Sequence, residues 1–154
     1  ELENLQKLSH KLGLTGKITW KGAQSQKGVF EAYENSDLFI MPSIIATDGD
    51  RDGLPNVLME AASKKVCCIA TDLPGITEFI RHDDTGWIVP SKNSRELTRS
   101  IISLSQDPAK RVRLAESANK LLVRHFSHAE NVQYIIGLLK SDLDTNEDVI
   151  QDSI

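Results

Sequence analysis

Three short apolar runs, each followed by a segment with helical periodicity, constrain the fold of this chain more than any other feature. The runs are "DLFIMPS" (37–43), "VCCIAT" (66–71) and "TGWIVP" (85–90). Continuous apolar runs of this length, bounded by turn residues, are typical of strands that are buried on both faces. Their alternation with helices predicts βαβ units, which form a mainly parallel sheet covered by helices on both faces. We therefore expect an α/β fold with three layers.

The remaining segments fit around such a sheet. Helical patterns cover 2–12, 26–36, 56–64, 94–106, 108–126 and 127–143, a turn and short helix cover 73–82, and "KITWKG" (17–22) is typical of a further strand. The last residues, "DTNEDVIQDSI", are acidic and aperiodic, and we expect them to be flexible. The predicted organisation is one folded domain over 1–140 and a flexible acidic tail over 141–154.

Composition excludes several classes of function. The net charge of −4 provides no electrostatic footprint for nucleic acid. No run of about 18 apolar residues exists, so no segment is predicted to span a membrane. The only cysteines, Cys67 and Cys68, are neighbours in an apolar run, which disfavours a disulfide between them. We expect buried, reduced thiols in a cytoplasmic protein.

The stretch "ATDGDRDGLPNVLMEAA" (46–62) concentrates the chemistry-bearing residues. Asp48, Asp50, Asp52 and Gly53 match the first half of a calcium loop, which needs a bidentate glutamate at its twelfth position. That position is Met59, and the flanking segments are a strand and a helix instead of two helices. The calcium loop is therefore disfavoured, and a solvated acidic loop remains an alternative for the first two aspartates.

A second interpretation treats the same stretch as an anion site at a helix start. Gly53 allows a ligand to approach the backbone closely, and Leu54, Asn56 and Val57 each carry an N–H group near the first helical turn. Free N–H groups and the aligned peptide dipoles favour phosphate or diphosphate at such a position. The alternative here is an ordinary transition from loop to helix.

Two carboxylates flank this anion site. Asp52 precedes it, and Glu60 interrupts the apolar sequence "VLMEAA" about one and a half turns into the helix. A half-buried glutamate on such a face requires a partner. Acids that accept hydroxyl protons on either side of a phosphate site suit a nucleotide-sugar, although a salt bridge or a surface position is the alternative for Glu60.

The loops 43–54 and 71–76 both follow predicted buried strands. In a parallel α/β sheet, ligands bind outside the carboxyl ends of the strands. We therefore expect these two loops to lie on the same rim of the sheet.

A long segment of the chain resembles a known family. The segment "SDLFIMPS…DGLPNVLMEAASKKVCCIATDLPGITEFIRHDDTGWIVP" is similar to the donor-binding half of retaining glycosyltransferases of the family-4 type. Members carry an acid, seven residues and a glutamate across a glycine-containing helix start. A strand, a glycine-containing loop with a glutamate, and a "TG-apolar-apolar-V" strand follow. The resemblance covers about 14–126 and implies a Rossmann-like three-layer α/β/α domain, which is one half of a GT-B architecture.

The resemblance also implies a role for each matching residue. Asp52 and Glu60 take the catalytic-site positions that contact hydroxyls of the transferred sugar and of the nucleotide ribose, respectively. Backbone around Gly53, Leu54 and Asn56 would face the diphosphate.

Other donor-binding positions lie in neighbouring loops. Ser43 would lie on the rim near the donor, and Pro74 and Gly75 occupy the second loop. Two residues depart from the pattern, because Asp52 is shorter than the usual glutamate and Pro74 replaces a glycine.

The resemblance further implies what the chain binds and lacks. The donor would be a UDP-, GDP- or ADP-sugar, with no metal and no other cofactor, and a hexosyl group would be transferred to an unknown acceptor with retention of configuration. The strand that usually supplies a basic pair to the diphosphate is missing, so the domain is expected to be truncated at its N-terminal edge. The N-terminal acceptor-binding domain of the same polypeptide is the expected partner, and any membrane association would come through it. We expect the fragment alone to be inactive.

Functions from other classes remain for comparison. A Rossmann oxidoreductase needs a Gly-x-Gly-x-x-Gly motif after a strand, and the chain has none. A non-catalytic nucleotide-sugar or phosphate-binding module is the closer alternative, and a pure interaction domain is the third.

Overall fold

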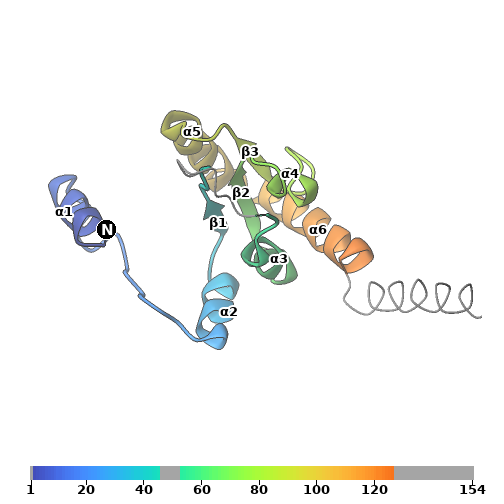
Figure 1. Cartoon of the computed structure of the whole chain (residues 1–154), viewed down its shortest axis with the longest axis horizontal. Helices are drawn as coiled ribbons and strands as arrows, with labels where there is room; N and C mark the ends of the chain where they lie inside the picture. The colour runs from blue at the N-terminus through green and yellow to red at the C-terminus, as the bar shows by residue number, and fades with distance from the viewer. Residues whose placement is uncertain (1, 46–52, 127–154) are drawn as a thin grey trace, which may run out of the picture.

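A three-stranded parallel sheet lies at the centre of the molecule (Figure 1). The computed structural model describes residues 2–45 and 53–126. The strands are β1 (Leu38–Met41), β2 (Cys67–Thr71) and β3 (Trp87–Val89), in the order β1-β2-β3. Ile69 on the central strand aligns with Ile40 on one side and with Trp87 on the other. All three predicted buried runs thus form strands, and the predicted parallel sheet is confirmed.

Helices precede, connect and follow these strands. They are α1 (Leu2–Lys11), α2 (Gln26–Glu34), α3 (Asn56–Ser63), α4 (Ile76–Phe79), α5 (Ser94–Ser105) and α6 (Pro108–His125). Three of them begin at a capping side chain that accepts a backbone N–H three residues later: Ser25 for α2, Asn93 for α5 and Asp107 for α6. The sequence therefore fixes these helix starts locally.

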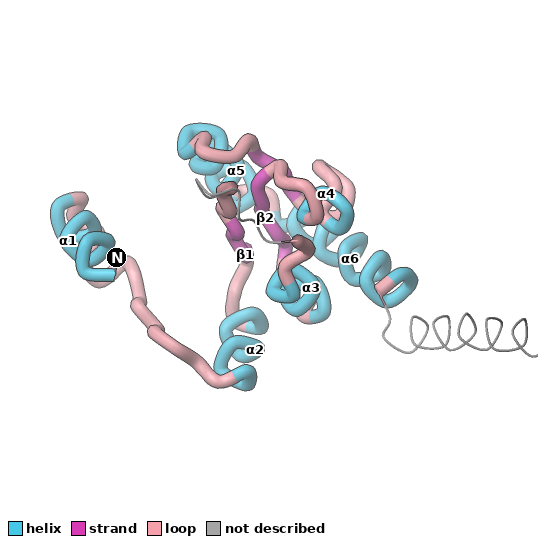
Figure 2. The backbone as a smooth tube through the Cα atoms, in the orientation of Figure 1, coloured by secondary structure: helices cyan, strands magenta, loops and turns pink. Residues whose placement is uncertain are grey.

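The central strand β2 is buried on both faces and separates two apolar clusters. Cys68 and Ala70 face a cluster formed with α2, α3, α4 and the second half of α6. Cys67 and Ile69 face a cluster formed with α5 and the first half of α6. In Figure 2 the strands run between α5 and α3. The expected Rossmann-like three-layer α/β/α arrangement is confirmed.

The long helix α6 holds the layers together through polar contacts. Arg111 donates hydrogen bonds to the carbonyl oxygens of Leu104 (2.6 Å) and Ser105 (2.9 Å) at the end of α5. Asn119 donates to the carbonyl of Ala62 near the end of α3 (3.0 Å). These contacts fix both faces of the sheet to one helix.

Two sequence expectations were wrong in detail. The segment 17–22 is turn and coil instead of a strand, and the Trp20 side chain within it is 40% exposed. The strand β1 is half-buried along its whole length, whereas full burial was expected. The outer edge of β1 has no paired strand within the described residues, which leaves β1 half-buried.

The N-terminal helix stands apart from the sheet, joined to α2 by an extended segment (Figure 1). The predicted helix is confirmed as α1, but its leucines at 2, 5 and 8, and Leu12 just after it, are exposed instead of buried. The helix predicted from 127 and the acidic tail lie outside the described residues. No helix in the described ranges is both long and apolar enough to cross a bilayer.

Candidate functional site

The loops after all three strands meet at Ser43, on the rim formed by the carboxyl ends of the strands. The buried Thr71 hydroxyl donates a hydrogen bond to the Ser43 carbonyl oxygen (2.8 Å), and the Ser91 hydroxyl donates to the same oxygen (3.4 Å). The Ser91 backbone N–H also donates to the Asp72 carboxylate (2.7 Å). Ser43 is therefore fixed through its backbone, at the edge of the sheet where α/β proteins bind ligands.

The second loop contacts the start of α3 through Gly75. This residue has a φ of 85°, and a Cβ atom built on it would lie 2.6 Å from the carbonyl carbon of Gly53 and 3.1 Å from the amide nitrogen of Leu54. Pro74, the residue before it, is exposed. The two loops expected on one rim do lie together there, in direct backbone contact.

The start of α3 leaves its first amides without a side-chain cap. The N-cap position is Pro55, which makes no side-chain capping bond, and the helix begins at Asn56, as expected. Gly53 and Asn56 are exposed, and Leu54 is half-buried. The first turn of a helix presents N–H groups that have no acceptor within the helix, and here these groups lie beside the Gly53–Gly75 contact.

Glu60 lies one turn further along α3 and faces α2. Its carboxylate accepts a hydrogen bond from the Tyr33 hydroxyl (3.4 Å), which also lies 3.3 Å from the Val57 carbonyl oxygen. Tyr33 is 6% exposed, and its ring makes edge-to-face contacts with Phe30 and Phe39. Burial raises the pKa of Tyr33 to about 12, with the negative charge of Glu60 as the next cause.

Glu60 was expected to have a partner, and in the structure this partner is the hydroxyl group of Tyr33. Glu60 makes no ion pair with another residue in 2–45 or 53–126, so the alternative of a salt bridge finds no support there. Sequence reasoning did not identify Tyr33 as this partner, because its alignment with Glu60 depends on how α2 packs on α3.

The acidic residues before Gly53 lie outside the described residues. Asp52 is among them, as are Asp48 and Asp50, so their predicted roles stay predictions. Among the residues that the structure does describe, no group of three or more histidine, cysteine, aspartate or glutamate side chains is arranged to hold a metal ion.

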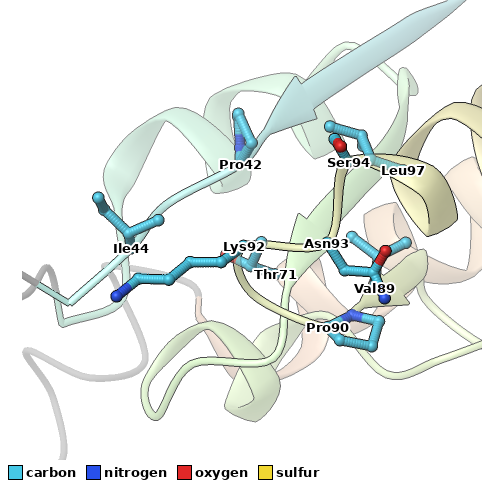
Figure 3. A pocket seen from close by; sticks show the side chains of 9 residues that line it. All are labelled: Pro42, Ile44, Thr71, Val89, Pro90, Lys92, Asn93, Ser94 and Leu97. Carbon is cyan, nitrogen blue, oxygen red and sulfur yellow. The ribbon is translucent and has the colours of Figure 1, made fainter.

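A cavity of about 210 Å³ opens on the same rim, on the side of α5 (Figure 3). Pro42 and Ile44 flank Ser43 in its wall, and Val89, Pro90 and Leu97 complete its apolar lining. The polar part of the lining comes from Thr71, Lys92, Asn93 and Ser94. Sequence reasoning missed this cavity, because its wall combines the ends of three strands with the start of a later helix.

The fold and the rim together define one half of a GT-B glycosyltransferase. The family model described as "Glycosyl transferases group 1" matches residues 1–121. This chain belongs to that family.

Individual relatives agree with this assignment. The amylovoran biosynthesis glycosyltransferase AmsK of Erwinia amylovora is 33% identical over 88 residues, which are 57% of this chain and 22% of the relative. The lipopolysaccharide core biosynthesis glycosyltransferase LpsE of Rhizobium meliloti is 29% identical over 141 residues, or 92% of this chain and 39% of the relative. The chain therefore spans well under half of the length of these relatives.

A solved structure shows the same fold. The crystal structure of Alr3699/HepE from Anabaena in complex with UDP-glucose matches with a TM-score of 0.79 at 21% identity. The match covers 91% of this chain and 36% of that chain.

Proposed function

We propose that this chain is the donor-binding half of a retaining glycosyltransferase, and that it binds a nucleotide-diphospho-sugar from which a hexosyl group is transferred. The observation that carries the proposal is the contact between Gly53 and Gly75 beside the uncapped start of α3, with Glu60 one turn behind. Family membership and the UDP-glucose complex of a protein with the same fold support it.

The diphosphate would lie over the start of α3. Amide groups near Leu54 and Asn56 would donate to its oxygens, because the first turn has free donors and the peptide dipoles favour negative charge there. Gly53 and Gly75 keep this approach free of side chains. Ser43, Pro74 and the cavity beside Pro42 and Ile44 would form the remaining wall.

Glu60 would accept hydrogen bonds from the ribose hydroxyls of the donor. In the described structure the Tyr33 phenol occupies this role at 3.4 Å, a long distance for an O–H···O bond. A ribose would replace a weak neutral donor with two hydroxyl groups. Asp52, at the other end of the diphosphate, would contact the transferred sugar.

The chemistry follows from the charge that grows on the leaving nucleoside diphosphate. Preorganised N–H groups stabilise such charge best in a site from which water is excluded. Here the α3 start supplies part of the stabilisation. The acceptor-binding site would come from the N-terminal half of the same polypeptide, and the basic pair from a strand at the N-terminal edge of the donor-binding half itself. We therefore expect the 154-residue chain to bind donor weakly and not to turn it over. No metal ion takes part in this scheme.

Titration with UDP, GDP, ADP and UDP-glucose tests the proposal, with amide chemical shifts of the 154-residue chain as the readout. We expect one nucleotide to shift the amides of the non-proline residues in 53–60 and 73–76 in a saturable manner. Glu60→Gln keeps the size of the side chain and removes its charge, so its affinity should fall by about tenfold, as expected when a charge-assisted hydrogen bond is lost. Glu116→Gln is the matched control, because Glu116 is exposed on α6 and belongs to none of the donor-site motifs.

Two results would count against this function. The donor site is wrong if none of the nucleotides shifts the amides at the α3 start, or if Glu60→Gln and Glu116→Gln bind equally well. Sugar transfer by the 154-residue chain alone would contradict the dependence on a second half without contradicting the donor site.

A further inference from the structure

A basic cavity lies at the edge of the sheet opposite to the rim. It has a volume of about 250 Å³, and Arg81, Asp84, Thr85, Ser117, Lys120, Leu121, Arg124 and His125 line it. The loop 80–86 leads into the amino end of β3, whereas the rim is formed by the carboxyl ends of the strands. The cavity is therefore separate from the proposed donor site.

The charges in this cavity are unbalanced. Arg81, Lys120 and Arg124 are cationic, and Asp84 is the only acid in the lining. Asp84 is already engaged, because its carboxylate accepts a hydrogen bond from Ser117 (3.1 Å) and lies 4.0 Å from the Arg81 guanidinium. A net positive cavity in a chain with a net charge of −4 is a local departure from the overall charge.

The two halves of α6 differ in how their cations are neutralised. In the first half, Lys110 and Arg113 pair with Asp83, and Arg111 pairs with Asp37. In the second half, Lys120 and Arg124 make no ion pair with any residue in the described ranges. They are four residues apart, where like charges on a helix repel each other.

Helix electrostatics explains only part of this arrangement. Cations in the last turn interact favourably with the helix dipole, which accounts for Arg124. The effect falls off within that turn, so it does not account for Lys120, and it does not explain why Arg81 from another loop lines the same cavity. Convergence of cations from two elements points to a bound anion.

We propose that this cavity binds a phosphate group, as a phosphomonoester or a diphosphate. Guanidinium groups donate paired hydrogen bonds that match phosphate oxygens, and the Lys120 ammonium adds a point charge. The Ser117 hydroxyl, now directed to Asp84, is a further donor in the lining. A lipid headgroup and a soluble phosphate share this chemistry.

The test uses the 154-residue chain and inorganic phosphate at pH 7, with chloride at equal ionic strength as the reference. We expect saturable shifts of the amides of Arg81–Thr85 and Ser117–His125 that chloride does not cause. The double variant Lys120→Ala with Arg124→Ala should lose at least about tenfold in affinity, because two charge-assisted contacts are removed. The control Lys27→Ala with Arg99→Ala changes the net charge equally at exposed sites on α2 and α5 and should bind normally.

A second arm identifies the source of the phosphate. Co-sedimentation with phosphatidylcholine vesicles that contain phosphatidic acid, but not with phosphatidylcholine alone, assigns a lipid headgroup if the double variant abolishes it. Phosphate shifts without co-sedimentation assign a soluble phosphate. A well-dispersed amide spectrum is required of each variant as the check that it is folded.

Three outcomes would overturn the proposal. The first is that chloride and phosphate cause the same amide shifts. The second is that the double variant and its control bind phosphate equally well. The third is phosphate binding that appears only after the five acidic residues of 142–152 are replaced by amides. In that case the cavity is covered by the acidic end of the chain and is not a ligand site.

Discussion

Gly75 and Gly53 touch through their backbones: a Cβ atom on Gly75 would lie 2.6 Å from the Gly53 carbonyl carbon and 2.7 Å from its oxygen. Real Cβ atoms do not approach backbone this closely, and backbone cannot move away as a side chain can. The loop after β2 can therefore pack against the start of α3 only because residue 75 is a glycine. Glycine also tolerates the φ of 85° at this position.

Gly75→Ala should weaken both stability and donor binding. The left-handed φ alone costs about 1–2 kcal/mol for alanine, and the clash with Gly53 adds to it by separating the two loops. Gly13→Ala provides the matched control, since Gly13 has a φ of 68° with no atom within 4 Å of its virtual Cβ. Denaturant unfolding and UDP titration of both variants measure the difference, and equal losses in the two would show that the contact does not matter.

Features set by local patterns could be read from the sequence. The apolar runs predicted β1, β2 and β3, and the helical patterns predicted helix starts at 26, 94 and 108 that the structure confirms, because strand burial and helix periodicity depend on adjacent residues.

Features that depend on a distant partner could not be read in this way. "KITWKG" has the composition of a strand, but a strand forms only beside a neighbour, and Ile18 and Trp20 stay exposed. Likewise, the sequence indicated that Glu60 needs a partner but not that a tyrosine 27 residues away supplies it. The Gly75–Gly53 contact depends on how two loops meet, which the glycines alone do not specify.

Thr71→Val should release the Ser43 loop. The hydroxyl of this buried residue donates to the Ser43 carbonyl at 2.8 Å, and valine has a similar shape without the donor. Loss of one such bond costs about 0.5–1.5 kcal/mol.

The serine variant separates the bond from the packing. Thr71→Ser keeps the hydroxyl and removes a methyl group, which costs about 0.8 kcal/mol. We expect the amide resonances of Ser43 and Ile44 to shift strongly in Thr71→Val and only slightly in Thr71→Ser. Equal shifts in the two variants would mean that packing, and not the hydrogen bond, fixes the rim.

Tyr33 should ionise late in an alkaline titration. Its pKa is raised from about 10 to about 12 by burial and by the charge of Glu60. As pH rises from 10 towards 12, the unfolded chain loses this proton while the folded chain retains it, so the free energy of unfolding decreases in that window.

Tyrosinate absorbance measures the ionisation of Tyr33 directly, because the chain has only two tyrosines and their absorbance steps can be told apart by the Tyr33→Phe variant. Tyr33→Phe should remove the late absorbance step and its part of the alkaline loss of stability. Glu60→Gln should shift the step to lower pH, because one cause of the raised pKa is gone. A late step that persists in Tyr33→Phe would assign it to another group.

The two cysteines should be inert towards thiol reagents in the folded protein. Burial raises the pKa of Cys67 to about 11 and that of Cys68 to about 12, so at pH 8 the reactive thiolate is scarce as well as inaccessible. Modification by an aromatic disulfide should follow the rate of opening of β2 and become fast for both thiols in denaturant.

Cys67 should react before Cys68. Its thiol lies closer to the positive charges of Arg111 and Lys110, which lower its pKa against the effect of burial, and it lines a surface cavity with Asp37 and Arg111. Cys68 lies instead in the apolar cluster with α3 and α6. The variants Cys67→Ala and Cys68→Ala each leave one thiol, so the slower reaction should belong to Cys67→Ala. Rapid modification of both thiols without denaturant would show that β2 is not the closed centre of the domain.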